Sequence, residues 1–298
     1  MTPYRTPTTI ALVLLPLITP SPPHACNLPS ELSRVVAKVE SADTLILDDG
    51  SEVVLIGTMP PVPTETDGPD QPAWPPAEAT RKHLEALVGG KAVDLAFAGR
   101  RHDRYGRQLA HVFVNQTTSR HWVQGDLITH GLARAYTLPG NTACIEDLLD
   151  QENLARANLA GHWGTGVFQD RSAHDPRELT RYRDTFQTIE GRIHHTTKVR
   201  GQQVVDFTAS DRTGFSVWIS PTSSTPRTAS SIAPGSLTGK RVRVRGWVEQ
   251  HRGPRVTLDN LRQIEILQDL PEDLPQTTTP APDNAATITP APIPATRQ

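Results

Sequence analysis

Proline placement restricts where this chain can form regular structure. Of its 27 prolines, 21 fall in three clusters, at residues 3–29, 60–76 and 271–294. Because proline removes a backbone donor and fixes φ, long strands and helices are expected only between these clusters. The 298 residues therefore contain two stretches that can fold, which fits one large domain or two small ones.

The first proline cluster surrounds an apolar run at residues 10–18, which follows one positive charge at Arg5. A run of this length is typical of a signal peptide and is too short to cross a bilayer. We predict a signal peptide over 1–25, export to the periplasm or the medium, and no transmembrane span in the mature chain. Residues 23–25 match a lipobox poorly, so lipidation of Cys26 is not expected.

The chain has two cysteines, Cys26 and Cys144. Two are too few for a disulfide-dense scaffold or for a four-cysteine zinc site. In an oxidising compartment they can form one bridge, and this is the pairing we expect. Two unpaired thiols are the alternative.

The stretch from Ser33 to about residue 164 alternates between strand and helix patterns. Asp48-Asp49-Gly50 is a hairpin signal between two of the strands. Strands are predicted at 35–39, 44–47, 52–56, 92–97 and 109–114, and helices at 76–87, 122–130 and 141–159, with Gly161 as the last C-cap. This order predicts a mainly β fold with helices (α+β), built on a five-stranded Greek-key barrel of the OB type.

Five short motifs follow one another in this stretch. They are Ser41-Ala42-Asp43-Thr44, Val54-Leu55-Ile56-Gly57, Asp103-Arg104-Tyr105-Gly106-Arg107, Gly131-Leu132-Ala133 and Ala160-Gly161-His162-Trp163. In type and order they resemble the staphylococcal nuclease (thermonuclease) family, whose fold is an OB-type barrel. The resemblance implies phosphodiester cleavage with a calcium ion held by carboxylates, a glutamate that activates water, and two arginines that bind the phosphate.

When the family's site residues are matched to this chain position by position, most of them have no counterpart. Asp43 corresponds to the first metal carboxylate and Arg107 to one phosphate-binding arginine. Val54 stands at the other arginine, Met59 at the second metal aspartate and Val62 at the glutamate. One carboxylate does not hold Ca²⁺ tightly, and one arginine leaves developing charge unopposed. We therefore predict an impaired site with no cofactor, or with Ca²⁺ if the chain is active.

Each remaining candidate residue can also have a role that involves no catalysis or ligand binding. Glu65, in the proline-rich loop, is either a displaced general base or a solvated acid, and Asp43 can instead cap a turn. Arg107 can be a solvated residue beside a hairpin. Four histidines lack metal-ligand spacing: His83, His111, His121 and His130. We expect no metal binding by them.

A second β pattern follows residue 186. Strands are predicted at 188–193, 204–207, 215–219, 241–249, 256–258 and 264–267. The phrase at 239–248, Gly-Lys-Arg-Val-Arg-Val-Arg-Gly-Trp-Val, resembles OB-fold modules appended to some bacterial thermonuclease-like proteins. The predicted organisation is a thermonuclease-like domain at 26–170, a linker or short helix at 171–185, an OB-like barrel at 186–267 and a disordered tail at 268–298.

The formal net charge of −2 hides a basic second domain. Residues 186–267 contain 12 basic and 6 acidic side chains. Because alternate strand residues share a face, Arg241, Arg243 and Arg245 are predicted to form one stripe. With nearby aromatics, such a stripe is suited to a phosphate backbone with stacked bases. An ordinary solvated face is the alternative.

Three functions therefore remain open from the residues alone. The leading hypothesis is a catalytically impaired, nuclease-like protein that binds nucleic acid or another polyanion, so that the chain is not an efficient enzyme. The second is an active phosphodiesterase that uses Asp43, Glu65 and Arg107 with a relaxed metal site. The third is an interaction or scaffold module of the cell envelope.

Overall fold

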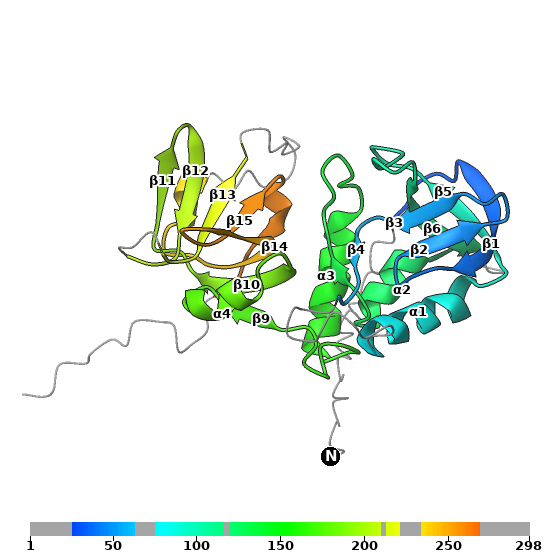
Figure 1. Cartoon of the computed structure of the whole chain (residues 1–298), viewed down its shortest axis with the longest axis horizontal. Coiled ribbons are helices and arrows are strands. Elements are labelled where there is room, and N and C mark those ends of the chain that lie inside the picture. The colour runs from blue at the N-terminus through cyan, green and yellow to red at the C-terminus, as the bar shows by residue number, and fades with distance from the viewer. Residues whose placement is uncertain (1–25, 63–74, 116–119, 210–212, 221–233, 269–298) are drawn as a thin grey trace, which may run out of the picture.

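The computed structural model describes residues 26–62, 75–115, 120–209, 213–220 and 234–268, which form two modules (Figure 1). The predicted signal peptide, Glu65 and all but the first residue of the predicted tail lie outside the described residues. The first module contains a barrel and three helices, and the second contains a large sheet and a short helix. In the described part of the chain, no helix is long and apolar enough to span a membrane.

Five strands close the barrel of the first module. They are β1 (Leu32–Val39), β2 (Thr44–Leu47), β3 (Glu52–Leu55), β5 (Ala92–Ala96) and β6 (Gln108–Asn115). Their order is β3-β2-β1-β5-β6, and a parallel pairing of β3 with β6 joins the two ends. The predicted five-stranded, OB-like barrel is confirmed. The short strand β7 (Arg120–Trp122) extends the sheet beyond β6, and β4 (Thr58–Met59) pairs with β8 (Arg134–Ala135).

Local sequence explains how the barrel forms. The β2–β3 hairpin turns at Gly50, whose φ of +81° is a conformation that glycine adopts without steric cost. Apolar residues of several strands then meet in one core, in which Leu45, Leu95 and Val112 are completely buried. The strand periodicity therefore fixes which face of each strand points into the barrel.

Three helices accompany the barrel, as predicted. They are α1 (Pro75–Val88), α2 (Val123–Thr129) and α3 (Ile145–Ala157). The third helix is shorter than predicted, because Cys144 and Leu159 near its two ends both have positive φ values, 59° and 51°. Gly161 is not its C-cap, since Asn158 ends the helix. Gly161 instead allows a close backbone approach: a Cβ there would lie 2.3 Å from the carbonyl oxygen of His130.

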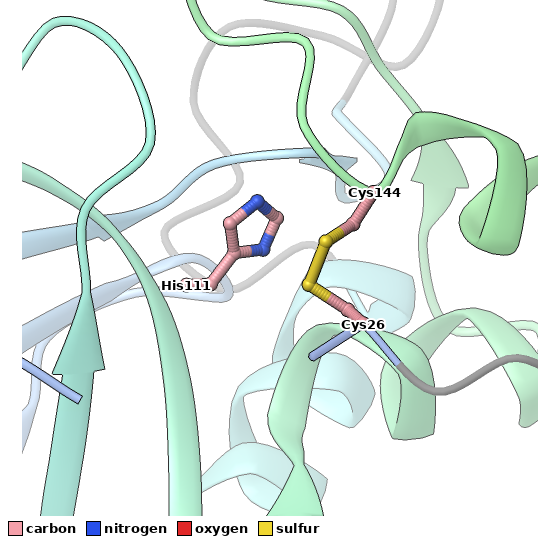
Figure 2. A group of neighbouring side chains, drawn as sticks. All are labelled: Cys26, His111 and Cys144. Atoms are coloured by element: carbon pink, nitrogen blue, oxygen red, sulfur yellow. A yellow bond between two sulfur atoms is a disulfide. The ribbon is translucent and has the colours of Figure 1, made fainter. Parts of the chain in front are cut away.

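A disulfide joins Cys26 to Cys144 across 118 residues. It ties the start of the described chain to the residue that precedes α3. His111 of β6 lies beside it in Figure 2, and the ligand atoms of these three residues lie within 4.8 Å of one another. Because the two sulfur atoms are bonded to each other, this group is not a metal site.

The second module is one sheet. Its strands are β9 (Asp170–Ser172), β10 (Phe186–Arg192), β11 (His195–Val199), β12 (Gln202–Asp206), β13 (Ser216–Ile219), β14 (Arg241–His251), β15 (Gly253–Leu258) and β16 (Ile264–Ile266). The order is β11-β12-β13-β15-β14-β10-β9, with β16 paired to β14. Within the described residues β11 and β9 do not pair, so the sheet is not closed. The prediction of a second closed barrel is corrected: β9 occupies the edge of β10 that a closing strand would need.

The segment 171–185, for which the sequence allowed a linker or a short helix, contains the helix α4 (Pro176–Arg181). The Asp175 side chain caps it by accepting from the N–H of Glu178 at 2.9 Å. Leu179 is completely buried and belongs to the core of the second module. The segment is therefore folded against the sheet.

Candidate nucleic-acid interface

Three neighbouring strands bring two of the family-like positions close to β3. The β2–β3 and β3–β6 ladders place Asp43 level with Leu55 and Arg107 level with Glu52. At about 3.3 Å per residue, the two positions are separated by roughly 10 Å along β3. Val54 lies between them on β3, at the position where the resemblance expects the second arginine.

Arg107 is held by the turn in which it lies. Its Nε donates to Asp103 Oδ2 at 2.7 Å, and the backbone N–H groups of Arg107 and Tyr105 donate to Oδ1 at 3.0 and 2.8 Å. Burial alone would raise the pKa of Asp103, but these hydrogen bonds outweigh it and hold the pKa below its usual range. The Arg107 side chain is 35% exposed, so it is oriented and still reachable from solvent.

An open groove of about 630 Å³ lies beside Arg107. Residues 50–52 line one part of it, and His102 with residues 105–108 line the other. Tyr105 is 67% exposed, and the guanidinium carbons of Arg104 and Arg107 lie 4.7 and 5.5 Å from its ring centre. This Arg107 groove therefore offers an exposed aromatic ring flanked by two cations, which is a suitable surface for phosphates and stacked bases.

Asp43 and the positions around it do not form a calcium site in the described residues. Asp43 Oδ1 accepts from the hydroxyls of Ser41 at 2.8 Å and Thr44 at 3.0 Å, which is the turn-forming role. Met59 and Val62, at the other expected ligand and base positions, carry no side-chain oxygen. Since Ca²⁺ takes six to eight oxygen ligands, the described side chains do not fit it.

Two of the three arginines in the β14 stripe are buried, so the prediction of an exposed stripe is wrong for Arg243 and Arg245. Arg245 is completely buried and Arg243 is only 8% exposed. Arg245 Nη1 donates to Glu152 Oε2 of α3 at 3.0 Å, and Arg241 and Arg243 both donate to Glu190 of β10. The strand alternates as predicted, but its basic face meets the first module and acidic partners, so Arg243 and Arg245 are unavailable to a phosphate backbone.

Glu152 and Arg245 are the centre of a buried interdomain ion-pair cluster, completed by Glu265 and Arg156. Burial alone would raise the pKa of Glu152, but the charges of Arg245 and Arg156 outweigh it and lower the pKa. Burial would lower the pKa of Arg245, but Glu152 and Glu265 outweigh it and raise the pKa. Arg134, buried nearby, has its pKa lowered to about 10, chiefly by burial. In Figure 1, α3 lies between the barrel and the second module, where this cluster joins them.

Sequence reasoning missed Glu152 and also a histidine group around Asp126. Glu152 lies within the helix predicted at 141–159, and nothing local indicates a buried charge there. Asp126 and His130 are separated by four residues in the region of α2, a spacing that places two side chains on one helix face and can be found by inspection. No local signal connects His83 to them.

Residues 61–165 match the family described as "Staphylococcal nuclease homologue". Over these residues the chain is similar to staphylococcal nuclease homologues. The matched range includes Arg107, while Asp43, Val54 and Met59 precede it. The resemblance drawn from the motifs is confirmed for residues 61–165, which contain three of the five motifs.

Two proteins of Bacillus subtilis (strain 168) are similar to parts of the chain. "SPbeta prophage-derived endonuclease YokF" is 34% identical over 110 residues, which are 36% of this chain and 36% of that protein. "Endonuclease YncB" is 29% identical over 144 residues, which are 47% of this chain and 66% of that protein. The chain thus spans about a third of one relative's length and just under two thirds of the other's.

Proposed function

We propose that the staphylococcal nuclease domain binds nucleic acid at the Arg107 groove and cleaves it poorly. The observation that carries the proposal is the content of this groove. An oriented, exposed arginine and an exposed tyrosine are present, while the neighbouring strand position is Val54. One of the two phosphate-binding arginines is thus present, whereas Met59 and Val62 replace a metal carboxylate and the base needed for cleavage.

Binding rests on two kinds of contact. The ring of Tyr105 is exposed enough for a base to stack on it, a contact worth about 1–3 kcal/mol per base in other proteins. Arg107 and Arg104 lie against the same ring and can reach the adjoining phosphates. Both contacts tolerate any sequence, so we expect little preference among bases.

Weak cleavage follows from the groups that are missing. In the transition state, the phosphate gains charge that a second guanidinium would oppose, and Val54 cannot do so. Met59 and Val62 remove a metal carboxylate and the base that the resemblance assigns. Removal of one charge-stabilising donor typically lowers kcat by about 10²–10³, so the combined deficit is large.

An active phosphodiesterase is the second candidate, because both relatives carry the word endonuclease in their names. In this alternative Asp43 contributes to a relaxed Ca²⁺ site, Arg107 binds the phosphate and Glu65 acts as base. Glu65 lies outside the described residues.

We also propose that the protein acts outside the cytoplasm, in the periplasm or the medium. The disulfide between Cys26 and Cys144 supports this location, since such bonds persist in oxidising compartments. An extracytoplasmic polyanion other than nucleic acid, or an envelope scaffold role, then becomes an outcome that the binding test distinguishes.

Fluorescence anisotropy with labelled single-stranded and duplex DNA tests the proposal. The native chain should bind with an affinity that falls linearly with salt on logarithmic axes, because phosphate contacts release counterions. Arg107→Ala should weaken binding and reduce the salt slope by about one. Arg241→Ala is the matched control: it removes an arginine that is already paired with Glu190, and it should leave binding unchanged.

Absent or salt-insensitive binding would contradict nucleic-acid binding and favour a scaffold. Equal losses in both variants would contradict the choice of the Arg107 groove.

A further inference from the structure

Asp126 lies at the centre of three histidines. Its Oδ1 lies 2.6 Å from Nε2 of His83 and 3.3 Å from Nδ1 of His130. Its Oδ2 lies 2.9 Å from Nε2 of His121. The carboxylate is 11% exposed, and the imidazoles, between 33% and 54% exposed, surround it. Both oxygens of one partly buried carboxylate therefore lie against imidazole nitrogens.

Four different places in the chain contribute to this histidine group. His83 belongs to α1, Asp126 to α2, His121 to β7, and His130 directly follows α2. The packing of α1 against α2 brings His83 beside His130, with ring centres 4.9 Å apart. The group is thus built by tertiary packing and is not a by-product of one helix face.

The spacing fits one small divalent ion. The ligand atoms of His83, Asp126 and His130 all lie within 4.8 Å of one another. Around a tetrahedral Zn²⁺ with bonds of about 2.0–2.1 Å, neighbouring ligand atoms are about 3.3 Å apart. The two separations from Asp126 Oδ1, 2.6 and 3.3 Å, are within a small side-chain adjustment of that value.

We propose that His83, Asp126 and His130 form a zinc site, with His121 as a positioning residue on the second carboxylate oxygen. Imidazole nitrogen and one carboxylate oxygen are a donor set that zinc accepts, whereas Ca²⁺ and Mg²⁺ prefer oxygen alone. A hydrogen bond to the distal oxygen of a ligating carboxylate is a frequent outer-shell contact at such sites. The Nδ1 of His130, which also lies 2.9 Å from the Asp126 carbonyl, would exchange that contact for the metal.

The fourth coordination position is accessible. Asp126, His130 and His121 line a groove of about 510 Å³ that Gln151 of α3 also borders. This groove shares no lining residue with the Arg107 groove. The zinc site therefore stands apart from the proposed nucleic-acid surface, and its test does not depend on nuclease activity.

Metal titration of the full chain tests the proposal, with protein made without a histidine tag and stripped by a chelator. Competition with a chromogenic zinc chelator should give one Zn²⁺ per chain with a dissociation constant in the micromolar range or below. Co²⁺ should produce the visible absorption of a tetrahedral centre. A tenfold excess of Ca²⁺ or Mg²⁺ should not displace zinc.

Variants locate the site. His83→Ala and His130→Ala should each weaken zinc binding at least tenfold, while His121→Gln should weaken it less. His251→Ala, an exposed histidine of β14, is the matched control and should bind like the native chain. Circular dichroism without metal checks that each variant is folded. No tight zinc binding, or equal binding by the native chain and both alanine variants, would overturn the proposal.

Discussion

The two groups of arginines in this chain have opposite surroundings. Arg107 lies in an open groove, pairs with Asp103 and keeps 35% of its side chain exposed. Arg245 has no exposed surface and lies between Glu152 of the first module and Glu265 of its own. The same residue type therefore serves an external surface in one region and joins two modules in the other.

The comparison also explains which sequence prediction was wrong. Strand alternation correctly indicates that Arg241, Arg243 and Arg245 share a face, but it carries no information about what covers that face. The covering element is α3 of the first module. Its residue Glu152 lies 93 residues before Arg245 in the sequence.

The largest expected effect is on the buried side of the comparison. Arg245→Met leaves Glu152 buried with one charge partner fewer, and such losses cost about 3–5 kcal/mol. Urea denaturation should therefore show a much lower midpoint for Arg245→Met. Arg107→Met is the matched control and should change stability by less than about 1 kcal/mol, because its pair is partly solvated. Equal losses of stability for the two substitutions would contradict the distinction between a buried and a partly exposed arginine.

A double variant sharpens this result. Glu152→Met combined with Arg245→Met removes both buried charges, so it should lose less stability than the sum of the two single substitutions. Strict additivity in the same denaturation experiment would contradict direct coupling between Glu152 and Arg245.

The disulfide should also stabilise the buried region around Glu152, since Cys144 directly precedes α3, which carries that residue. Replacing both cysteines by serine should lower the free energy of unfolding by about 2–5 kcal/mol, because the bond closes a long loop. Urea denaturation of the native chain, of the double serine variant and of the native chain with reductant measures this loss. An unchanged midpoint after verified reduction would contradict this role.

A buried and an exposed histidine extend the comparison to pH. Burial lowers the pKa of His111 from 6.5 to about 4, against a smaller opposing backbone hydrogen bond at Ala143. As pH falls from about 6.5 to 4, the unfolded chain takes up this proton first, so stability falls by about 3 kcal/mol at most.

His111→Gln should therefore show a shallower loss of stability between pH 6.5 and 4 than the native chain, measured by denaturation at each pH. His102→Gln, which changes an exposed residue of the Arg107 groove, should follow the native curve. Parallel curves for all three proteins would show that His111 does not contribute this pH dependence.

Much of the first module was predictable because its signals are local. The Gly50 hairpin, the alternating strands and the motif order depend on neighbouring residues, and they gave the barrel and the position of Arg107. The histidine group, the cover over β14 and the edge strand β9 depend on contacts between distant segments. His83 and Asp126 are 43 residues apart, and no periodicity connects them.

The smallest effect on stability should accompany the largest effect on function, at the Arg107 groove. Here Arg107→Ala should leave the urea midpoint nearly unchanged and weaken DNA binding by about tenfold, as expected for one lost charged contact. Anisotropy titrations of variant and native chain at one fixed salt concentration measure this. If Arg107→Ala were destabilised but bound DNA as tightly as the native chain, Arg107 would serve stability and not binding, which would contradict the account.

Cleavage of labelled DNA with Ca²⁺ tests the central claim most directly. We predict that the native chain cleaves DNA only slowly, and that Arg107→Ala binds DNA less tightly and lowers this small rate further. Restoring the family residues with Val54→Arg, Met59→Asp and Val62→Glu should raise the rate. Rapid cleavage by the native chain that Arg107→Ala abolishes would contradict the claim and establish an active phosphodiesterase.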